Sequence, residues 1–466
     1  MKINFTITAA LTALLLSPGV GGQTLDALQK GFKEIPDSVQ TAAYWYWMND
    51  NISKEGVVKD LQAMKSVGIN RAFIGNQQAD DIPYGDIKLG SEQWLDITRT
   101  ALRTAADLGI EIGVFNCPGW SQSGGPWVKE EESMRHLVMK EGYPSDISDK
   151  RIVRVLAIPP VPGMQLEKEV QSVAGQACQV EFEVPEGFTA RTVSIRADAR
   201  TDRMVKVLSD GVAIREFFFD RHRLDLNVGF EPLAPVVISL PETKARKYTV
   251  VIEKYRKVED VGFKVVLSDV PEIEKWPEKT LVKMFQDPLP AWDHYMWKVP
   301  AECSDAFKVV DPGKVIDLTD SLRKGSGVPD IPDNYRVVTF CMETTGVTNA
   351  PAVPEGTGLE IDKMSRKHIE THFNAFVGKL IERIPPEDRR TWKVVVQDSY
   401  ETGGLNWTDD MVEVFRNRYG YDPVPYLPAM AGVTVGSADR SERFLWDLRR
   451  LIADRVAYDY VGGMRC

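Results

Sequence analysis

The chain contains little cysteine and little histidine, with five residues of each among 466. The cysteines are scattered, odd in number and never spaced as Cys-x-x-Cys, so they predict no disulfide framework. The histidines form no His-Glu-x-x-His motif, which argues against a zinc site. Cys117 follows a predicted strand, but no histidine lies near it in the sequence. We therefore interpret Cys117 as a small packing residue rather than a nucleophile.

The chain also lacks an excess of basic residues and, after its first residues, any long apolar run. Its formal net charge is −10, which does not fit the basic face of a nucleic-acid-binding protein. An apolar stretch at residues 5–16 follows Lys2 and precedes small residues up to position 22. It is too short to span a bilayer and is typical of a bacterial signal peptide. We expect residues 1–22 to be this peptide, and the protein to be exported, either periplasmic or secreted, with no membrane span.

Two consecutive β-strand and α-helix units are predicted near the N-terminus. Strands are expected around residues 44–47, 69–74 and 110–115, with helices that start near Ser53 and Ser91. Each helix ends at a glycine, Gly68 or Gly109, about forty residues apart, which is close to the repeat length of a (β/α) barrel. We expect residues 23–148 to form the first part of such a barrel.

The hydrophobic periodicity changes after residue 148. Short alternating segments, such as residues 192–195 and 248–252, predict antiparallel strands, and Asp210-Gly211 predicts a tight hairpin turn. We therefore predict an inserted antiparallel β-sandwich-like domain at residues 149–280 and a connecting segment at 281–335. Helical patterns return afterwards, and residues 336–466 are expected to continue the barrel.

About four parallel strands can be counted, whereas a closed (β/α)8 barrel needs eight. The predicted fold class is therefore α/β, a TIM-like barrel that is incomplete by about half and is truncated at the C-terminus. Half a barrel would leave unpaired apolar edges. The alternative is an open doubly wound sheet that is complete as it stands.

The segment from Val394 to Glu401 carries the strongest chemical signal. Three valines predict a buried strand, which is followed by Gln-Asp-Ser-Tyr-Glu at 397–401. Residues at the carboxyl ends of barrel strands face the active-site mouth. Glycoside hydrolysis needs a protonated carboxyl beside the leaving oxygen and ionised partners around it, so Asp398 and Glu401 are candidates. The alternative is that Asp398 caps a helix and that Glu401 is a solvated loop charge.

Several motifs, taken in order along the chain, resemble glycoside hydrolase family 106, the α-L-rhamnosidases of plant-polysaccharide-degrading bacteria. The resemblance extends from about Tyr44 to the last residue and includes the inserted β domain. The motifs are residues 44–50, 115–127, 344–351 and 358–363, the segment that ends in Glu401, and Arg418-Tyr-Gly-Tyr-Asp422.

The resemblance implies removal of a terminal α-linked L-rhamnose from plant-type polysaccharides or glycosides, with inversion, and a dependence on calcium. Inversion uses a general acid and a general base roughly 6.5–9.5 Å apart. Glu401 matches the acid, and the base is expected on a later strand, beyond residue 466. Should the base lie within the chain, the candidates are Asp50, Glu343, Glu360 and Asp398. No EF-hand-type run is present, so the sequence names no metal ligands.

Six residues are expected to bind the sugar: Asn49, Asn116, Trp120, Asp362, Lys363 and Asp398. Asparagine amides suit vicinal hydroxyls, although both asparagines are also compatible with helix capping. A tryptophan ring suits the apolar face of a deoxysugar, and Gly124-Gly125 would allow a close backbone approach. The neighbouring Trp127 could equally pack its loop onto the barrel.

Asp362 and Lys363 suit adjacent hydroxyls, but an aspartate near a helix N-terminus is also favoured by the helix dipole.

Two competing functions are also compatible with the sequence. One is a retaining β-glycosidase-like barrel enzyme, and the other is a non-catalytic carbohydrate-binding remnant.

Overall fold

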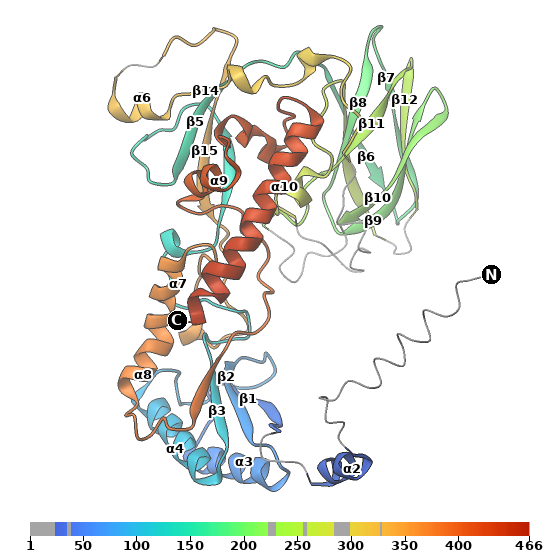
Figure 1. Cartoon of the computed structure of the whole chain (residues 1–466). Coiled ribbons are helices and arrows are strands. Elements are labelled where there is room, and N and C mark those ends of the chain that lie inside the picture. The colour runs from blue at the N-terminus through green and yellow to red at the C-terminus, as the bar shows by residue number, and fades with distance from the viewer. Residues whose placement is uncertain are drawn as a thin grey trace, which may run out of the picture.

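A computed structural model describes residues 24–34, 39–221, 230–254, 259–283, 299–326 and 329–465. The expected signal peptide lies outside these residues. The first helix, α2 (Leu25–Lys33), buries none of its residues and stands apart from the other elements (Figure 1). In the described ranges, no helix is both long enough and apolar enough to cross a bilayer.

One four-stranded sheet is parallel throughout, with strand order β1-β2-β3-β16. Its first strand shows how the sequence sets the two faces of this sheet. Trp45 and Trp47 are buried against the helices, whereas the alternating Tyr44 and Tyr46 point to the opposite face. The strands are β1 (Ala42–Met48), β2 (Arg71–Gln77), β3 (Glu111–Phe115) and β16 (Trp392–Val396).

The helices of this part begin and end where the sequence predicts. The Ser53 hydroxyl accepts from the Gly56 N–H at the start of α3 (Lys54–Ser66), and Ser91 caps α4 (Glu92–Leu108) in the same way. Gly68 and Gly109 follow with positive φ angles of 83° and 67°. The helical patterns expected after residue 335 include α7 (Arg366–Phe373) and α8 (Lys379–Arg383), which are joined by a π-helical turn.

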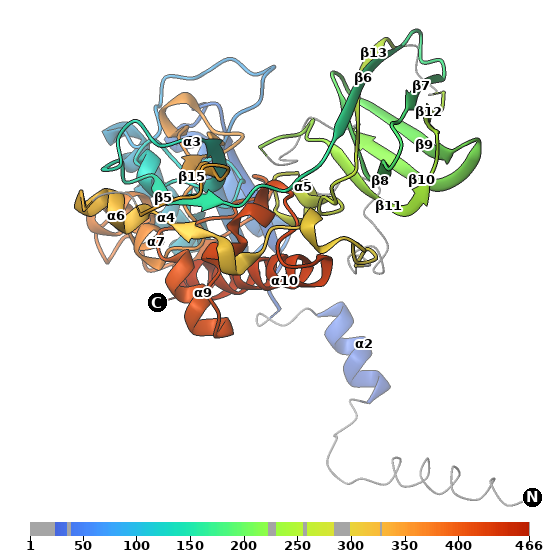
Figure 2. The same ribbon diagram turned by 90° about the horizontal axis from the view of Figure 1, so that it is seen from above.

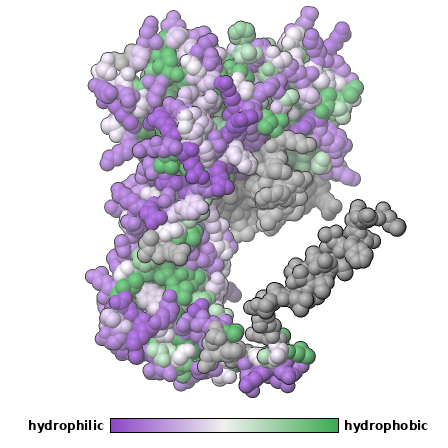
Figure 3. Space-filling model, in the orientation of Figure 1, coloured by the Kyte–Doolittle hydropathy of each residue, from purple (hydrophilic) through white to green (hydrophobic). Residues whose placement is uncertain are grey.

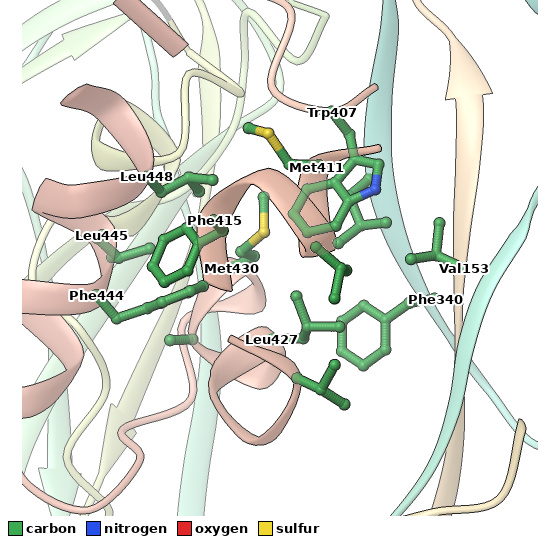
Figure 4. Packing of buried hydrophobic residues seen from close by; sticks show 14 of the residues in the cluster. Val153, Phe340, Trp407, Met411, Phe415, Leu427, Met430, Phe444, Leu445 and Leu448 are labelled. Atoms are coloured by element: carbon green, nitrogen blue, oxygen red, sulfur yellow. The ribbon is translucent and has the colours of Figure 1, made fainter. Parts of the chain in front are cut away.

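A second sheet is antiparallel, with strand order β14-β5-β15-β4. Helices α9 and α10 pack on it, and their shared core contains Phe340, Trp407, Phe415 and Leu448 (Figure 4). The strands are β4 (Arg135–Glu141), β5 (Ile152–Ile158), β14 (Ile316–Asp317) and β15 (Arg336–Thr344). The helices outside the parallel part are α5 (Trp276–Lys279), α6 (Thr319–Lys324), α9 (Met411–Tyr419) and α10 (Ala438–Arg455).

This second sheet corrects two of the expected boundaries. Residues 152–158, which were assigned to the insertion, pair with β15, and residues 336–344, which were assigned to the barrel, supply that strand. The pairing joins segments about 180 positions apart. A local period of two predicts a strand but not its partner, which explains the difference.

The third part is a β-sandwich of two antiparallel sheets, with orders β10-β9-β12-β7 and β11-β8-β13-β6. It stands to one side of the other two parts when seen from above (Figure 2). The predicted hairpin turn lies between β9 and β10, where Asp210 and Gly211 have φ angles of 44° and 86°. The strands are β6 (Gln165–Ser172), β7 (Cys178–Glu183), β8 (Thr189–Ala197), β9 (Thr201–Ser209), β10 (Val212–Arg221), β11 (Val236–Lys244), β12 (Lys247–Ile252) and β13 (Val261–Ser268).

The fold is therefore mixed α/β with several antiparallel sheets, and the described residues form no closed barrel. The parallel sheet ends in edge strands, β1 on one side and β16 on the other. Val394, Val395 and Val396 of β16 are only half-buried. On the face seen in Figure 3, hydrophobic residues gather over the lower part of the molecule, where this sheet lies.

Candidate active site

An aromatic layer covers the face of the parallel sheet that α3 and α4 leave open. The ring of Tyr44 lies 5.9 Å from that of Phe73 and 5.3 Å from that of Phe115, measured between centroids. Glycines on β2 and β3 make room for these rings. A Cβ atom at Gly113 would come within 2.5 Å of the Phe73 ring. Tyr44 is half exposed, so the layer presents aromatic surface to solvent.

Trp120 extends this layer from the loop that follows β3. Its ring lies 6.0 Å from that of Tyr46, and the side chain is part-buried. The loop is held in place by the backbone of Ala350, whose carbonyl oxygen accepts from the N–H groups of Trp120 and Ser121. Trp120 is thus placed beside a second aromatic ring and extends the aromatic surface on which a sugar could stack.

Asp398 lies at the edge of the aromatic layer, where β16 ends. Its Oδ1 accepts from the backbone N–H of Ser399 at 2.9 Å, and the Tyr44 hydroxyl lies 3.5 Å from the same oxygen. Burial, and then the negative charge of Asp398, raise the pKa of Tyr44. The Tyr44 hydroxyl therefore keeps its proton at neutral pH and can donate toward the carboxylate.

Glu401, the expected general acid, follows Asp398 by three positions and its side chain is exposed. Its segment runs beside the loop after β3, because the Gln122 N–H donates to the Ser399 carbonyl at 3.2 Å. Asp398, Glu401 and Trp120 thus belong to neighbouring loops at the carboxyl ends of β3 and β16. A solvent-facing carboxyl on the loop next to that of Trp120 is suited to proton transfer to a glycosidic oxygen.

A fully buried ion pair lies under this surface. Lys363 Nζ is 2.7 Å from Glu360 Oε2, and the Ser123 hydroxyl donates to the same oxygen at 2.5 Å. Neither charged side chain is accessible to solvent. Lys363 was expected to bind the sugar, but the structure places its ammonium beneath the Tyr400 ring, 4.9 Å from the centroid.

Asn116 is also buried, and its side-chain amide donates to the Tyr460 hydroxyl at 3.1 Å. Tyr460 in turn donates to the Gln122 carbonyl. Asn116 thus supports the loop that carries Trp120, and its amide is below the exposed surface rather than on it.

Two other expected sugar-binding residues are engaged in contacts within the protein. The Asn49 amide donates to the carbonyls of Ala79 and Ile82 and accepts from the Ala79 N–H, so it fastens the loop after β2. Asp362 is fully buried, accepts from Arg135 at 2.9 Å and from the Thr408 hydroxyl at 2.6 Å. Neither side chain joins the aromatic layer.

The Trp127 ring packs inside the protein. It stacks on Phe376 at 5.3 Å, and its Nε1 donates to His372 Nδ1 at 2.9 Å. The adjacent glycines serve this packing, since a Cβ at Gly125 would come within 2.4 Å of the Trp127 ring. The packing interpretation of Trp127 thus fits the structure, whereas Trp120 remains with the exposed surface.

The four carboxylates considered as alternative bases differ in environment. Asp50 is buried and contacts Lys88 Nζ at 3.2 Å, and burial raises its pKa. Glu343 forms an ion pair with Lys140, and Glu360 is fully enclosed. Only Asp398 adjoins the aromatic layer.

Sequence reasoning did not assign a role to Tyr44, Tyr46, Ser123 or Tyr460. The alternation of tyrosine and tryptophan in β1 was a usable signal, because it separates an open face from a helix-covered face. No local signal marks Tyr460, which meets Asn116 from 344 positions away.

Calcium was expected from the family resemblance alone. Among the described residues, no three or more His, Cys, Asp or Glu side chains gather where they could hold an ion. The described residues therefore name no calcium site, and calcium remains a prediction.

The comparisons with known proteins point to one family. Residues 33–466 match the model of glycoside hydrolase family 106, described as alpha-L-rhamnosidase. The structure of a rhamnosidase from Novosphingobium sp. PP1Y is similar to this chain, with a TM-score of 0.74 and 26% sequence identity. That match covers 94% of this chain and 46% of the rhamnosidase.

A protein of Formosa agariphila named "Putative beta-glucuronidase" is 28% identical over 459 residues. The match covers 98% of this chain and 31% of that protein. The chain thus spans less than half the length of both relatives.

Proposed function

Because this chain belongs to glycoside hydrolase family 106, we propose that it takes part in removing terminal α-L-rhamnose from plant-type glycans by an inverting mechanism. The observation that carries the proposal is the placement of Asp398 and Glu401 on the loop after β16, beside the exposed ring of Tyr44 and the loop of Trp120. Glycosidic cleavage needs such a carboxyl at a surface that can hold a sugar ring.

In this mechanism Glu401 is the general acid and donates its proton to the glycosidic oxygen as the bond to the anomeric carbon breaks. Asp398 accepts hydrogen bonds from sugar hydroxyls, and Tyr44 holds that carboxylate through its own hydroxyl. Trp120 and Tyr46 stack against the apolar face and methyl group of the deoxysugar.

Inversion also needs a carboxylate that removes a proton from the attacking water on the opposite face of the sugar. We place this base on a strand outside the 466 residues, because Glu360 is enclosed, Asp50 and Glu343 are engaged with lysines, and Asp398 is assigned to the sugar hydroxyls. The isolated chain should accordingly turn over rhamnosides about 10²–10⁴-fold more slowly than a relative that has both groups.

A glucuronidase is the second candidate, because one relative carries that name. A uronate carboxylate is best recognised by an accessible arginine or lysine. Among the described residues assigned to this site, Lys363 is the one side chain of this kind, and it is buried under Tyr400 and paired with Glu360. The assigned residues therefore favour an uncharged deoxysugar over a uronate.

The deciding experiment incubates the purified chain with an aryl α-L-rhamnoside and an aryl β-D-glucuronide and follows the released sugar by NMR. We expect slow release of rhamnose whose first-formed anomer is β. Release of α-rhamnose would contradict inversion and support a retaining enzyme. Release of glucuronate alone would replace the proposed substrate, and rhamnose binding without any release would indicate a binding remnant.

Two further proposals concern the environment of the protein. Residues 1–22 should direct export, which N-terminal sequencing of the protein from a bacterial host would test.

Calcium should raise the melting temperature of the chelator-treated chain in a concentration-dependent way, with magnesium as the control. An unchanged melting temperature at millimolar calcium would contradict a calcium site in this chain.

A further inference from the structure

The buried pair of Glu360 and Lys363 is unusual in how it is satisfied. Both side chains are fully buried, yet the Lys363 ammonium and the Ser123 hydroxyl converge on a single oxygen, Glu360 Oε2. The other oxygen, Oε1, has no hydrogen-bond partner in the described part of the chain. Removing two charges from water carries a desolvation cost that their attraction need not repay, so such a pair is poor evidence of a stabilising role.

The ammonium of Lys363 also reaches both sequence neighbours of Glu401. It lies 4.9 Å from the Tyr400 ring centroid and 3.5 Å from the Thr402 hydroxyl. Thr402 is itself buried, whereas Glu401 between them is exposed. A cation under an aromatic face is attracted by the ring quadrupole, and most strongly when it is desolvated. Lys363 is therefore placed to hold the side chains of the two residues that flank the exposed carboxyl.

Two other contacts complete a support around the loop. The Gln122 N–H donates to the Ser399 carbonyl, and the Tyr460 hydroxyl donates to the Gln122 carbonyl. The Tyr460 ring lies 5.9 Å from Lys363 Nζ, so the ammonium lies near two tyrosine rings, those of Tyr400 and Tyr460. Ser123 links this support back to Glu360.

We propose that Lys363 is a positioning residue for the general acid, held in place by Glu360 and Ser123. The ammonium fixes Tyr400 and Thr402, so that Glu401 is presented in one orientation to the glycosidic oxygen. Lys363 makes no contact with the sugar. The proposal rests on the proposed function for the role of Glu401, but the ordering of the loop does not depend on it.

The test uses the full chain and removes both charges together, because Lys363→Met alone would leave Glu360 buried without its counter-ion. The double variant Glu360→Gln/Lys363→Met keeps the side-chain volumes close to the original. Lys367→Met, which removes an exposed lysine from α7, is the matched control. Circular dichroism and melting verify that each variant is folded.

The first measurement is hydrogen–deuterium exchange of the backbone amides at residues 398–405. We expect exchange in the double variant to be at least about tenfold faster there, with the control unchanged. Equal exchange in both variants would overturn the positioning role. This readout needs no turnover, so it decides the proposal even if the chain cleaves no rhamnoside.

The second measurement compares leaving groups on α-L-rhamnosides. A poorly placed acid should lower kcat about tenfold or more for alkyl rhamnosides, which need protonation, and under about threefold for a dinitrophenyl rhamnoside, with KM unchanged. The same loss for every leaving group would overturn the proposal. Cleavage of glucuronides only would refute the proposed function while leaving the exchange result valid.

Discussion

The hydroxyl of Tyr44 lies 3.5 Å from Oδ1 of Asp398, although the two residues are 354 positions apart. Tyr44 belongs to β1 and Asp398 follows β16, and these are the two edge strands of the parallel sheet. Strand spacing alone would place the edges roughly 14 Å apart. The Tyr44 ring lies 5.3 Å from that of Phe115 on β3, the neighbour of β16, so the tyrosine side chain spans part of this distance and brings its hydroxyl to the carboxylate.

The Tyr44 hydroxyl should contribute to sugar binding through this contact. Tyr44→Phe keeps the ring but removes the donor, so kcat/KM for an aryl rhamnoside should fall about two- to tenfold, as for the loss of one ordinary hydrogen bond. Steady-state kinetics measures the effect. Tyr143→Phe, an exposed tyrosine outside the aromatic layer, is the control. A full loss of activity would instead assign Tyr44 a role in the chemical step.

Glu401→Gln should separate substrates by their leaving groups. Removing the acid should lower the rate on natural rhamnosides by about 10²–10⁴-fold and affect activated aryl rhamnosides much less. The measurement is the rate of sugar release from each substrate, with the protein at high concentration. Glu413→Gln, an exposed residue on α9, is the control. Equal losses for both substrate types would remove Glu401 from the acid role.

As the pH rises from 5 to 7, Glu272 should lower the stability of the chain, against the opposite contribution of the buried His136 and His372, whose pKa values burial lowers. Burial raises the pKa of Glu272 to about 7. Below the pKa of about 4.5 that Glu272 has in the unfolded state, both states are protonated, and the group adds no pH dependence to the free energy of unfolding. Between the two pKa values only the folded state keeps the proton, so a rise in pH disfavours folding. The full loss, reached above the folded pKa, is up to about 3 kcal/mol at 1.36 kcal/mol per pKa unit.

Urea denaturation of Glu272→Gln at pH 5 and pH 8 tests this linkage. The variant should gain stability over the parent at pH 8 and show little difference at pH 5. Glu216→Gln, on an exposed position of β10, controls for the removal of one negative charge. The stability of the parent is compared with that of the variant at each pH. If the parent gained stability relative to the variant between pH 5 and pH 8, the prediction would be contradicted.

The core between the antiparallel sheet and α10 should be the main source of stability in that part. Trp407 is 2% exposed within this core (Figure 4), and Trp407→Ala should cost about 3–5 kcal/mol in unfolding free energy. Trp446 on α10 is 57% exposed, so Trp446→Ala should change stability by less than about 0.5 kcal/mol. Similar costs for the two variants would show that the core is packed differently.

Local features followed directly from the sequence. Ser53 and Ser91 cap the helices that they were expected to cap, and Gly109 ends α4 in the left-handed conformation that favours glycine. The Asp210-Gly211 turn was equally predictable. Each depends on a few adjacent residues whose backbone preferences act alone.

The site was only partly predictable for the same reason. Asp398, Glu401 and Trp120 were predicted to lie on neighbouring loops because they follow parallel strands, and the carboxyl ends of such strands share one edge of the sheet. It did not reveal that Lys363 is enclosed or that Asn49 is engaged by a loop. Those outcomes depend on which distant backbone lies above each side chain.

Short-range periodicity and backbone preference are enough to set the helix ends, the hairpin turn, the two faces of β1 and the polar segment after β16. Tertiary packing sets the pairing of β5 with β15, the contact of Tyr460 with Asn116, and the position of Glu360 and Lys363 under the loop of Glu401. These contacts join residues far apart in the chain, and packing and desolvation, which no local pattern encodes, select them.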